Sequence, residues 1–274
     1  GKYKGMRLDR LIDLKGEPLL GSKISNRKFP LLVKILNTND KLSVQVHPDD
    51  EYAEKHEGEM GKTEAWYVME AEEGSYIILG TSGCSENEFK QSLKDGNVED
   101  CMNKIEVKKG DVYYLKSGLI HSMGPGLTIA EIQQNSDVTY RVYDYNRDRK
   151  LHIKKALDIM NFNLKAKRSV GIKIEHDNYI KTYHCLNKHF SLEVYDVKTS
   201  FQEISDEERF FIFTAVEGDG LIRYDGGKEN IHRGNSVLIP ATLGKYEISG
   251  KLKLLKSYVP SISKVENEIL DLIK

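Results

Sequence analysis

The sequence has few cysteines, no long apolar run and almost no excess of charge of either sign. Its 274 residues include 41 Lys and Arg against 42 Asp and Glu, a formal net charge of -1. A chain without excess positive charge lacks the electrostatic attraction to nucleic acid or to an anionic membrane surface. No apolar stretch approaches the roughly 18 residues of a membrane span, and no segment resembles a signal peptide. We therefore expect a cytoplasmic protein without nucleic-acid or membrane partners.

The cysteines are three in number and far apart in the sequence. Cys84, Cys101 and Cys185 form no Cys-X-X-Cys pair, which metal and redox sites commonly use. Isolated cysteines of cytoplasmic proteins are usually reduced. We therefore predict three reduced, structural thiols.

Most of the chain alternates apolar and polar residues with a period of two, a pattern typical of half-buried β-strands. One block of this pattern extends to about Tyr145 and a second from about Tyr179 to Pro260, with the polar stretch 165–178 between them as a linker. Three segments favour helices, at residues 49–57, 86–96 and 154–163. Many short strands and few helices favour β-sandwiches or jelly rolls over a doubly wound fold.

The two blocks share a short motif, which suggests a repeated domain. GDVYYLKSG (110–118) is echoed by GNSVLIPAT (234–242), each a turn followed by an apolar strand. We therefore predict an all-β fold with a few short helices, built from two barrels in tandem. The predicted domains are residues 1–150, a helix and linker at 151–178, and residues 179–274. In the second domain, GDG (218–220) and DGG (225–227) predict hairpin turns.

Four residues of the first block have the chemistry of metal ligands. Gln45 and His47 are two apart on a predicted strand, so their side chains project from the same face. Glu64 and His121 belong to later strands, and inward-facing residues of a small barrel converge on its interior. Two imidazoles, a carboxylate and an amide oxygen can surround a divalent cation and leave a position for water or substrate. Each residue alone is a weak signal, but together they predict one cation site.

Three basic residues lie near these candidate ligands in the predicted fold. Lys34 interrupts the apolar strand LLVKIL, Lys62 is two residues before Glu64, and Arg141 follows His121. A charge in an apolar strand is costly unless it is paired or faces water or an anion. A metal with convergent cations suits a phosphorylated, hydroxylated substrate. The alternative is that Lys62 and Arg141 are ordinary surface charges.

Four motifs together resemble one enzyme family. They are LLVKILNTNDKLSVQVHPDD, GKTEAWYV, GDVYYLKSGLIHSMGPG and EIQQNSDVTYRVYDYNR. These strings are similar to those of the type I mannose-6-phosphate isomerases in their short bacterial form, and the similarity covers nearly the whole chain. The resemblance implies a zinc-dependent enzyme of the cupin (jelly-roll) superfamily that interconverts mannose 6-phosphate and fructose 6-phosphate.

The resemblance also implies roles for individual residues. His47, Glu64 and His121 match the family's metal ligands, for one zinc ion per chain, and Gln45 matches a fourth ligand of longer relatives. Arg141 matches the catalytic arginine. Further pocket residues are Lys62, Glu131 and Lys34. Lys62 is our first choice for holding the phosphate. Glu131 is either the group that transfers the proton or a structural acid of its strand.

The sequence departs from the family pattern in two places. Short-form members carry, ahead of the stretch that matches GKYKG (1–5), a segment with a Trp-Gly-Gly turn and a Gly-Glu-Ser-Trp-Glu run. We expect the sequence to begin part-way into a longer natural chain, because it opens at Gly1 without an initiator methionine in a stretch that already resembles ordered protein. A protein without that segment would lose one strand and some pocket acids of the first barrel. In the second block, FFIFTAVEGDG has no histidine pair and GNSVLIPAT ends without a ligand. We expect the second barrel to be metal-free and structural.

Other classes of function stay open from the sequence. A cupin dioxygenase would share the fold but bind iron. A non-catalytic sugar-phosphate-binding cupin would keep the pocket without turnover. A structural or partner-binding sandwich would need an exposed apolar face, and no segment singles one out. The resemblance favours the isomerase, acting on a small sugar phosphate as a monomer or a homodimer.

Overall fold

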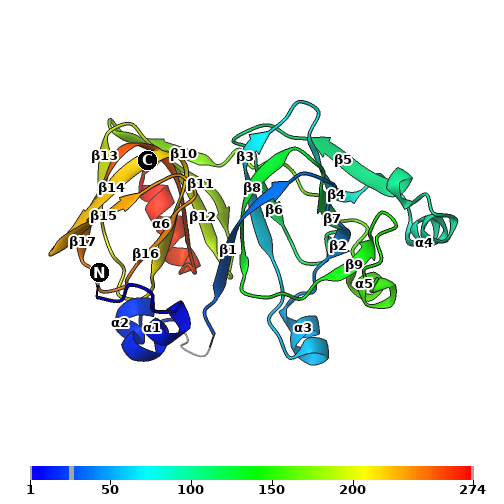
Figure 1. The fold of residues 1–274 in the computed structure, drawn as a ribbon, viewed down its shortest axis with the longest axis horizontal. Coiled ribbons are helices and arrows are strands. Elements are labelled where there is room, and N and C mark those ends of the chain that lie inside the picture. Colours follow the sequence, from blue (N-terminus) through cyan, green and yellow to red (C-terminus); the bar gives the residue numbers. More distant parts are fainter. Residues whose placement is uncertain (1, 25–27, 273–274) are drawn as a thin grey trace. The chain divides into compact units, whose positions relative to one another are not determined.

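The structure is a computed structural model that describes residues 2–24 and 28–272 (Figure 1). Strands predominate in this part of the chain, and its α-helices are short, from four to eleven residues, as the strand-rich sequence pattern predicted. None of these helices has the length and apolar character needed to cross a membrane. The chain divides into two compact units, which we name the middle unit (residues 32–169) and the terminal unit (residues 1–31 and 170–274).

The middle unit is built from two β-sheets. One has four strands in the order β1 (Leu31–Thr38), β8 (Leu127–Gln134), β3 (Glu64–Ala71) and β6 (Val112–Leu115). The other has five, in the order β5 (Met102–Glu106), β4 (Tyr76–Thr81), β7 (His121–Met123), β2 (Val44–Val46) and β9 (Tyr140–Tyr143). Figure 1 shows this unit in colours from blue to green.

An apolar cluster joins the inner faces of these two sheets. Trp66 and Ile129 of the four-stranded sheet belong to the same cluster as Ile77 and Met123 of the five-stranded sheet. Burial of this apolar surface stabilises the face-to-face packing. A second apolar cluster covers the outer face of the five-stranded sheet. It joins that face to α4 (Glu86–Asp95), the 3-10 helix η1 (Val98–Cys101) and α5 (Ile153–Ile159).

The two clusters show which side chains of β2 and β9 point outward and which point inward. Val44, Val46, Tyr140 and Val142 all belong to the outer cluster. Because successive side chains of a strand point to opposite faces, the residues between them point inward, toward the four-stranded sheet. This alternation places Gln45 of β2 and Arg141 of β9 on the inner face.

The three predicted helices are present; the first two end as the sequence suggested, whereas the third, α5, ends at Ile159 rather than near residue 163. In α3 (Asp50–Glu57), the Asp49 side chain caps the first turn by accepting the backbone N–H of Tyr52. Ser85 and Glu88 form a reciprocal capping box at the start of α4, and Gly96 ends it in a left-handed conformation. Three further helices were not predicted: α1 (Leu8–Lys15), α2 (Glu17–Leu20) and α6 (Ile262–Leu272).

The terminal unit contains one large antiparallel sheet. Six of its strands follow the order β10 (Ile172–Glu175), β11 (Tyr179–Leu186), β12 (Ser191–Val197), β17 (Lys245–Tyr258), β14 (Phe211–Tyr224) and β15 (Gly227–Ile231). Two more strands extend it, β13 (Ser200–Ile204) paired with β17 and β16 (Ser236–Ile239) paired with β14.

The N-terminal helices belong to this terminal unit rather than to the unit that follows them in sequence. Leu19 and Leu20 are buried. Their carbonyl groups accept the backbone N–H groups of Ala241 and Phe210. The observed division therefore differs from the predicted one, because backbone hydrogen bonds between distant segments leave no local pattern in the sequence.

Two local predictions in the terminal unit are wrong and one is confirmed. GDG (218–220) is not a turn: β14 runs through it, with a bulge between Ala215 and Glu217. The predicted linker 165–178 contains β10, which pairs with β11. DGG (225–227) does form a hairpin turn, since Tyr224 pairs with Gly227.

The prediction of three reduced thiols is also wrong. Cys84 and Cys101 form a disulfide, and Cys185 is buried outside it. The 3-10 helix η1 returns the chain after α4 and places the two Cα atoms 5.7 Å apart, within the usual range for a disulfide. This proximity depends on a local fold that the spacing of the cysteines does not reveal.

The interior of the terminal unit contains a network of ion pairs and tyrosine hydroxyls. The Glu203 carboxylate accepts hydrogen bonds from Tyr195, Tyr246 and Lys256 at 2.5, 2.6 and 2.7 Å. Burial alone would raise the pKa of Glu203, but the charge of Lys256, followed by that of Lys181, lowers it to about 2. The carboxylate is therefore ionised over the whole range in which most proteins stay folded.

This network predicts how the stability of the terminal unit depends on pH. The pKa of Glu203 is lower in the folded state than the ordinary value of 4.5. The stability that the ionised Glu203 carboxylate gives the folded protein is therefore fully present above pH 4.5 and is lost as the pH falls toward 2. We expect Glu203→Gln to lower the free energy of unfolding by about 3 kcal/mol at pH 7 and by progressively less below pH 4.5.

Urea unfolding followed by circular dichroism measures this effect, because the single tryptophan, Trp66, lies in the other unit. Glu229→Gln is the control, since Glu229 is an exposed acid of the same sheet. A difference between wild type and Glu203→Gln that stayed constant from pH 7 to pH 2 would show that Glu203 acts through shape rather than charge.

Candidate metal centre

Three potential metal ligands meet between the two sheets of the middle unit. They are His47, which follows β2, Glu64 at the start of β3, and His121 at the start of β7. Their ligand atoms lie within 4.8 Å of one another. The Nε2 atom of His47 is 3.2 Å from Glu64 Oε1, and that of His121 is 3.8 Å from Glu64 Oε2. All three side chains are at least 98% buried.

Close backbone contacts around His47 bring the other two ligands to it. Lys62 donates its backbone N–H to the Pro48 carbonyl (2.9 Å), directly after His47. Only glycine fits at position 61, because a Cβ there would lie 2.4 Å from the carbonyl carbon of Asp49. The Gly118 N–H donates to the His47 carbonyl at 2.8 Å. The segments that carry Glu64 and His121 are thus both tied to the end of β2.

Hydrogen bonds to the backbone set the ring tautomers of both histidines. Nδ1 of His47 lies 2.9 Å from the Val138 carbonyl, and Nδ1 of His121 lies 2.9 Å from the Leu119 carbonyl. A carbonyl oxygen only accepts, so each Nδ1 carries the proton and each Nε2 keeps its lone pair. This is the usual support for a metal-binding histidine.

The atoms that face the centre of this group have no hydrogen-bond partner in the described part of the chain. They are His47 Nε2, His121 Nε2 and Glu64 Oε1, all buried, and the last forms an ion pair with the Lys62 ammonium at 3.0 Å. Two nitrogen lone pairs and a carboxylate oxygen that face one another repel one another, and native proteins rarely leave buried polar atoms unsatisfied. A divalent cation would satisfy all three at once, so the residues fit the metal that the sequence predicted.

The charge state of the group also suits a cation. Burial lowers the pKa of His47 to about 3, helped by the charge of Lys62, and burial lowers the pKa of His121 as well. Both rings are therefore neutral at pH 7, the form that binds metal. Burial would raise the pKa of Glu64, but Lys62 and then His47 hold it well below the ordinary value. Two neutral nitrogens and one carboxylate resemble the donor set of catalytic zinc sites.

Gln45 lies beside this group on the inner face of the five-stranded sheet. It pairs directly with His121 across β2 and β7. Side chains of directly opposed residues share a face, with Cβ atoms about 5 Å apart. The structure thus places Gln45 next to one of the three potential ligands.

Lys62 is part of the centre and not a surface charge. Its side chain is 6% exposed, and its Nζ lies 3.0 Å from Glu64 Oε1. The alternative interpretation of Lys62 as an ordinary surface charge is therefore wrong. Its ammonium group is paired with Glu64, and this pairing keeps the carboxylate ionised.

Glu131 and Lys34 form a second polar group on the inner face of the four-stranded sheet. Lys34 Nζ lies 3.1 Å from Glu131 Oε1. The indole N–H of Trp66 donates both to Glu131 Oε2 (3.0 Å) and to Glu64 Oε2 (3.1 Å). Burial, and then the negative charge of Glu64, raise the pKa of Glu131 to about 7. Glu131 is thus next to the three potential ligands but is not one of them.

Arg141 lies in the same row of residues as Gln45 and His121. It pairs with Gln45 across β9 and β2, and two strand spacings separate it from His121, roughly 10 Å. Its Nη1 donates to the Lys150 carbonyl at 2.9 Å. Its Nε is buried and has no hydrogen-bond partner among the described residues. Arg141 therefore flanks the three potential ligands without joining them.

Sequence reasoning missed two residues of this site, Trp66 and Gln133. Trp66 connects Glu64 to Glu131, and Gln133 accepts a hydrogen bond from Lys34. Both stand two residues after a predicted site residue on the same strand. The period of two would have placed them on the same face, so a signal was present.

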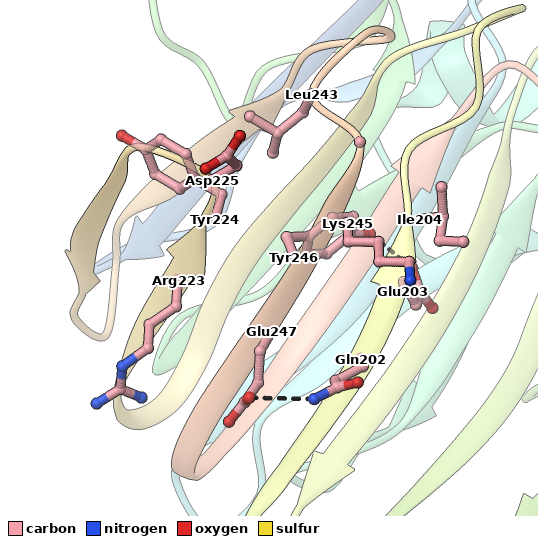
Figure 2. A pocket seen from close by; sticks show the side chains of 11 residues that line it. Gln202, Glu203, Ile204, Arg223, Tyr224, Asp225, Leu243, Lys245, Tyr246 and Glu247 are labelled. Carbon is pink, nitrogen blue, oxygen red and sulfur yellow. Dashed lines mark hydrogen bonds between the residues drawn. The ribbon is translucent and has the colours of Figure 1, made fainter.

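A cleft of about 700 Å³ in the terminal unit contains none of these residues. Figure 2 shows that its wall is formed by β13, β14 and β17. Arg223, Glu247 and Gln202 stand opposite one another on these strands, and so do their immediate neighbours Tyr224, Tyr246 and Glu203. Neighbours along a strand point to opposite faces. The residues that line the cleft therefore do not share one face, and none of them belongs to the group of potential metal ligands.

Comparison with known proteins connects this geometry to a family. Residues 1–92 match the family model described as phosphomannose isomerase type I, catalytic domain, and residues 179–259 match mannose-6-phosphate isomerase, cupin domain. The mannose-6-phosphate isomerase of Streptococcus mutans is 36% identical over 264 residues, covering 94% of this chain and 82% of that protein. The chain belongs to the type I phosphomannose isomerase family. The resemblance seen in the sequence motifs is thereby confirmed.

Solved structures of phosphomannose isomerases share the fold. The crystal structure of mannose 6-phosphate isomerase from Bacillus subtilis superposes with a TM-score of 0.87 at 32% identity, covering 94% of this chain and 83% of that one. A mutant phosphomannose isomerase from Salmonella typhimurium, at 14% identity, superposes with a TM-score of 0.73 over 93% of this chain and 85% of that one. At that identity the likeness concerns the fold alone.

Proposed function

We propose that the chain interconverts mannose 6-phosphate and fructose 6-phosphate at a centre formed by His47, Glu64 and His121. The observation that carries this proposal is the convergence of two nitrogen lone pairs without hydrogen-bond partners and one carboxylate oxygen, all buried, in a member of the phosphomannose isomerase family. The curated relatives that match nearly the whole chain are named mannose-6-phosphate isomerases.

The group we propose to be held there is one zinc ion, with Gln45 as a fourth ligand. A divalent cation with an open position polarises carbonyl and hydroxyl oxygens of a substrate. The reaction moves a proton between carbon 2 and carbon 1 of the open-chain sugar, so it needs a base that can return the proton it takes. We assign that role to Glu131, because Trp66 holds its carboxylate next to Glu64 while Lys34 orients the other oxygen.

The basic residues then have separate roles. Lys62, our first choice for the phosphate, is paired with Glu64, and we propose that it keeps this ligand ionised. Arg141 has a buried Nε without a hydrogen-bond partner in the described residues, and we propose that it binds substrate oxygens. Lys34 keeps about a third of its side chain exposed, which allows it to contact the substrate.

We further propose that both units are cupin-type jelly rolls and that the terminal unit holds no metal. Its interior carboxylates are already neutralised, because Lys181 lies 3.2 Å from Glu193 and Lys256 lies 2.7 Å from Glu203. The described residues of this unit also contain no group of three potential ligands like that of the middle unit. A cytoplasmic location and a monomer or homodimer complete the proposal and rest on the sequence pattern.

Metal removal tests the proposed function. We expect a strong chelator to abolish isomerisation in a coupled assay on the protein, and about one equivalent of zinc to restore it. Fluorescence of Trp66 should report the same titration, because its ring lies 5.5 Å from that of His121. Turnover that survived chelation would contradict the metal centre, and a second stoichiometric ion would contradict the metal-free terminal unit.

The same preparation distinguishes the rival functions. Sugar-phosphate binding without turnover in the zinc-loaded protein would identify a non-catalytic binding cupin. Oxygen uptake with ferrous iron would identify a dioxygenase.

A further inference from the structure

Gln133 lies at the metal centre and contacts two of its supporting segments. It stands directly opposite Glu64 across β8 and β3, so the two side chains share the inner face. Its exposed fraction is 0%. Its Oε1 accepts from Lys34 Nζ at 2.6 Å. Its Nε2 donates to the carbonyls of Gln134 (2.9 Å) and Ser136 (2.8 Å).

These three bonds fix the direction of the amide. The carbonyls of Gln134 and Ser136 can only accept, so they require the NH₂ group, and the Lys34 ammonium can only donate, so it requires the oxygen. The opposite orientation would set oxygen against oxygen and NH₂ against ammonium. The side chain therefore holds one end on Lys34 and the other on the loop after β8.

The loop that Gln133 holds also supports a metal ligand. The Ser136 hydroxyl donates to the Met60 carbonyl (2.7 Å) and accepts the Val138 N–H (3.3 Å). The Val138 carbonyl is the group that keeps the proton on Nδ1 of His47. A change in the shape of this loop would therefore alter which ring nitrogen of His47 carries its lone pair.

We propose that Gln133 is a positioning residue for the isomerisation, acting on both sides of the centre. On one side it fixes the Lys34 ammonium against Glu131, and on the other it fixes the loop that orients His47. The catalytic part of this inference rests on the proposed function. The effect of Gln133 on His47 does not depend on turnover.

Gln133→Met tests the proposal, because methionine fills a similar volume and makes none of the three bonds. We expect the dissociation constant for zinc, measured by chelator competition, to rise by about 10-fold to 100-fold, the usual cost of losing support for a ligand. We expect kcat to fall by at least about 10-fold, since Glu131 loses its oriented lysine. Lys34→Met should reproduce the loss of kcat and leave the zinc affinity unchanged.

Thr38→Val is the matched control. Thr38 is buried at the far end of β1, the strand that carries Lys34, and its hydroxyl donates to the Gly124 carbonyl at 2.7 Å. The variant loses this bond and the one that Thr38 accepts from the Leu127 N–H (3.1 Å), which joins β1 to β8, without touching the centre. We expect lower thermal stability with unchanged kcat and zinc affinity. If Gln133→Met showed this same pattern, or no change, the proposal would be overturned.

The tautomer of His47 gives a readout that does not depend on activity. In nitrogen NMR spectra of the metal-free protein, we expect His47 to carry its proton on Nδ1 in wild type and to populate both tautomers in Gln133→Met. Ser136→Ala, a milder change in the same loop, serves if Gln133→Met does not fold. Retention of a pure Nδ1–H tautomer in the folded variant refutes the proposed support of His47. Absence of isomerase activity in zinc-loaded wild type would instead refute the proposed function.

Discussion

Replacing Glu64 with glutamine is expected to remove the bound metal and to lower kcat at least about 10³-fold. Glutamine keeps the size of the side chain but not its charge, and Glu64 is the single anionic member of the proposed ligand set. The change would also leave the buried Lys62 ammonium without its counterion. Breaking one partner out of a buried ion pair costs about 3–5 kcal/mol, so the free energy of unfolding of the metal-free variant should fall as well.

Glu131→Gln is the matched control for this prediction. Both carboxylates are buried, and both accept the same indole N–H of Trp66. We expect Glu131→Gln to retain about one zinc ion per chain while losing turnover, because Glu131 is assigned the proton and not the metal. Metal content after gel filtration, measured beside the coupled assay, separates the two variants. Stoichiometric zinc in Glu64→Gln would show that the centre is held by other groups.

Local patterns in the sequence were sufficient to predict the parts of the fold that depend on neighbouring residues. Alternation with a period of two predicted the strands, and the same alternation predicted that Gln45 and His47 share one face. Asp49 and Gly96 marked a helix start and a helix end as expected. These features are set by backbone geometry over a few residues, so a single sequence displays them.

Features that depend on contacts between distant segments could not be predicted in this way. The hydrogen bond from Phe210 to the Leu20 carbonyl assigns the N-terminal helices to the terminal unit. The Cys84–Cys101 disulfide depends on how η1 follows α4. In the candidate site, the contacts of Gln133 depend on the register between β3 and β8, which sets Gln133 opposite Glu64. A shift of one residue would have turned Gln133 away from the centre.

Arg141 is expected to be required for turnover and dispensable for the metal. We predict that Arg141→Ala lowers kcat by about 10² or more while the chain keeps its zinc, because removing a group that stabilises developing charge typically has this cost. The structure supports this separation: Arg141 faces the same side as His121 but lies two strands away, and its backbone pairs with Gln45.

Arg223→Ala is the control for general effects of removing an arginine, since Arg223 is exposed on the terminal unit and bonds only Ser249 among the hydrogen bonds described for it. We expect it to leave kcat and metal content unchanged. Loss of zinc in Arg141→Ala would show that the residue supports the β2–β9 pair structurally. Unchanged kcat would return Arg141 to the alternative that it is an ordinary surface charge. A loss of kcat with full metal content would show that the buried, unpartnered Nε of Arg141 binds the substrate, because Arg141 is not one of the three potential metal ligands.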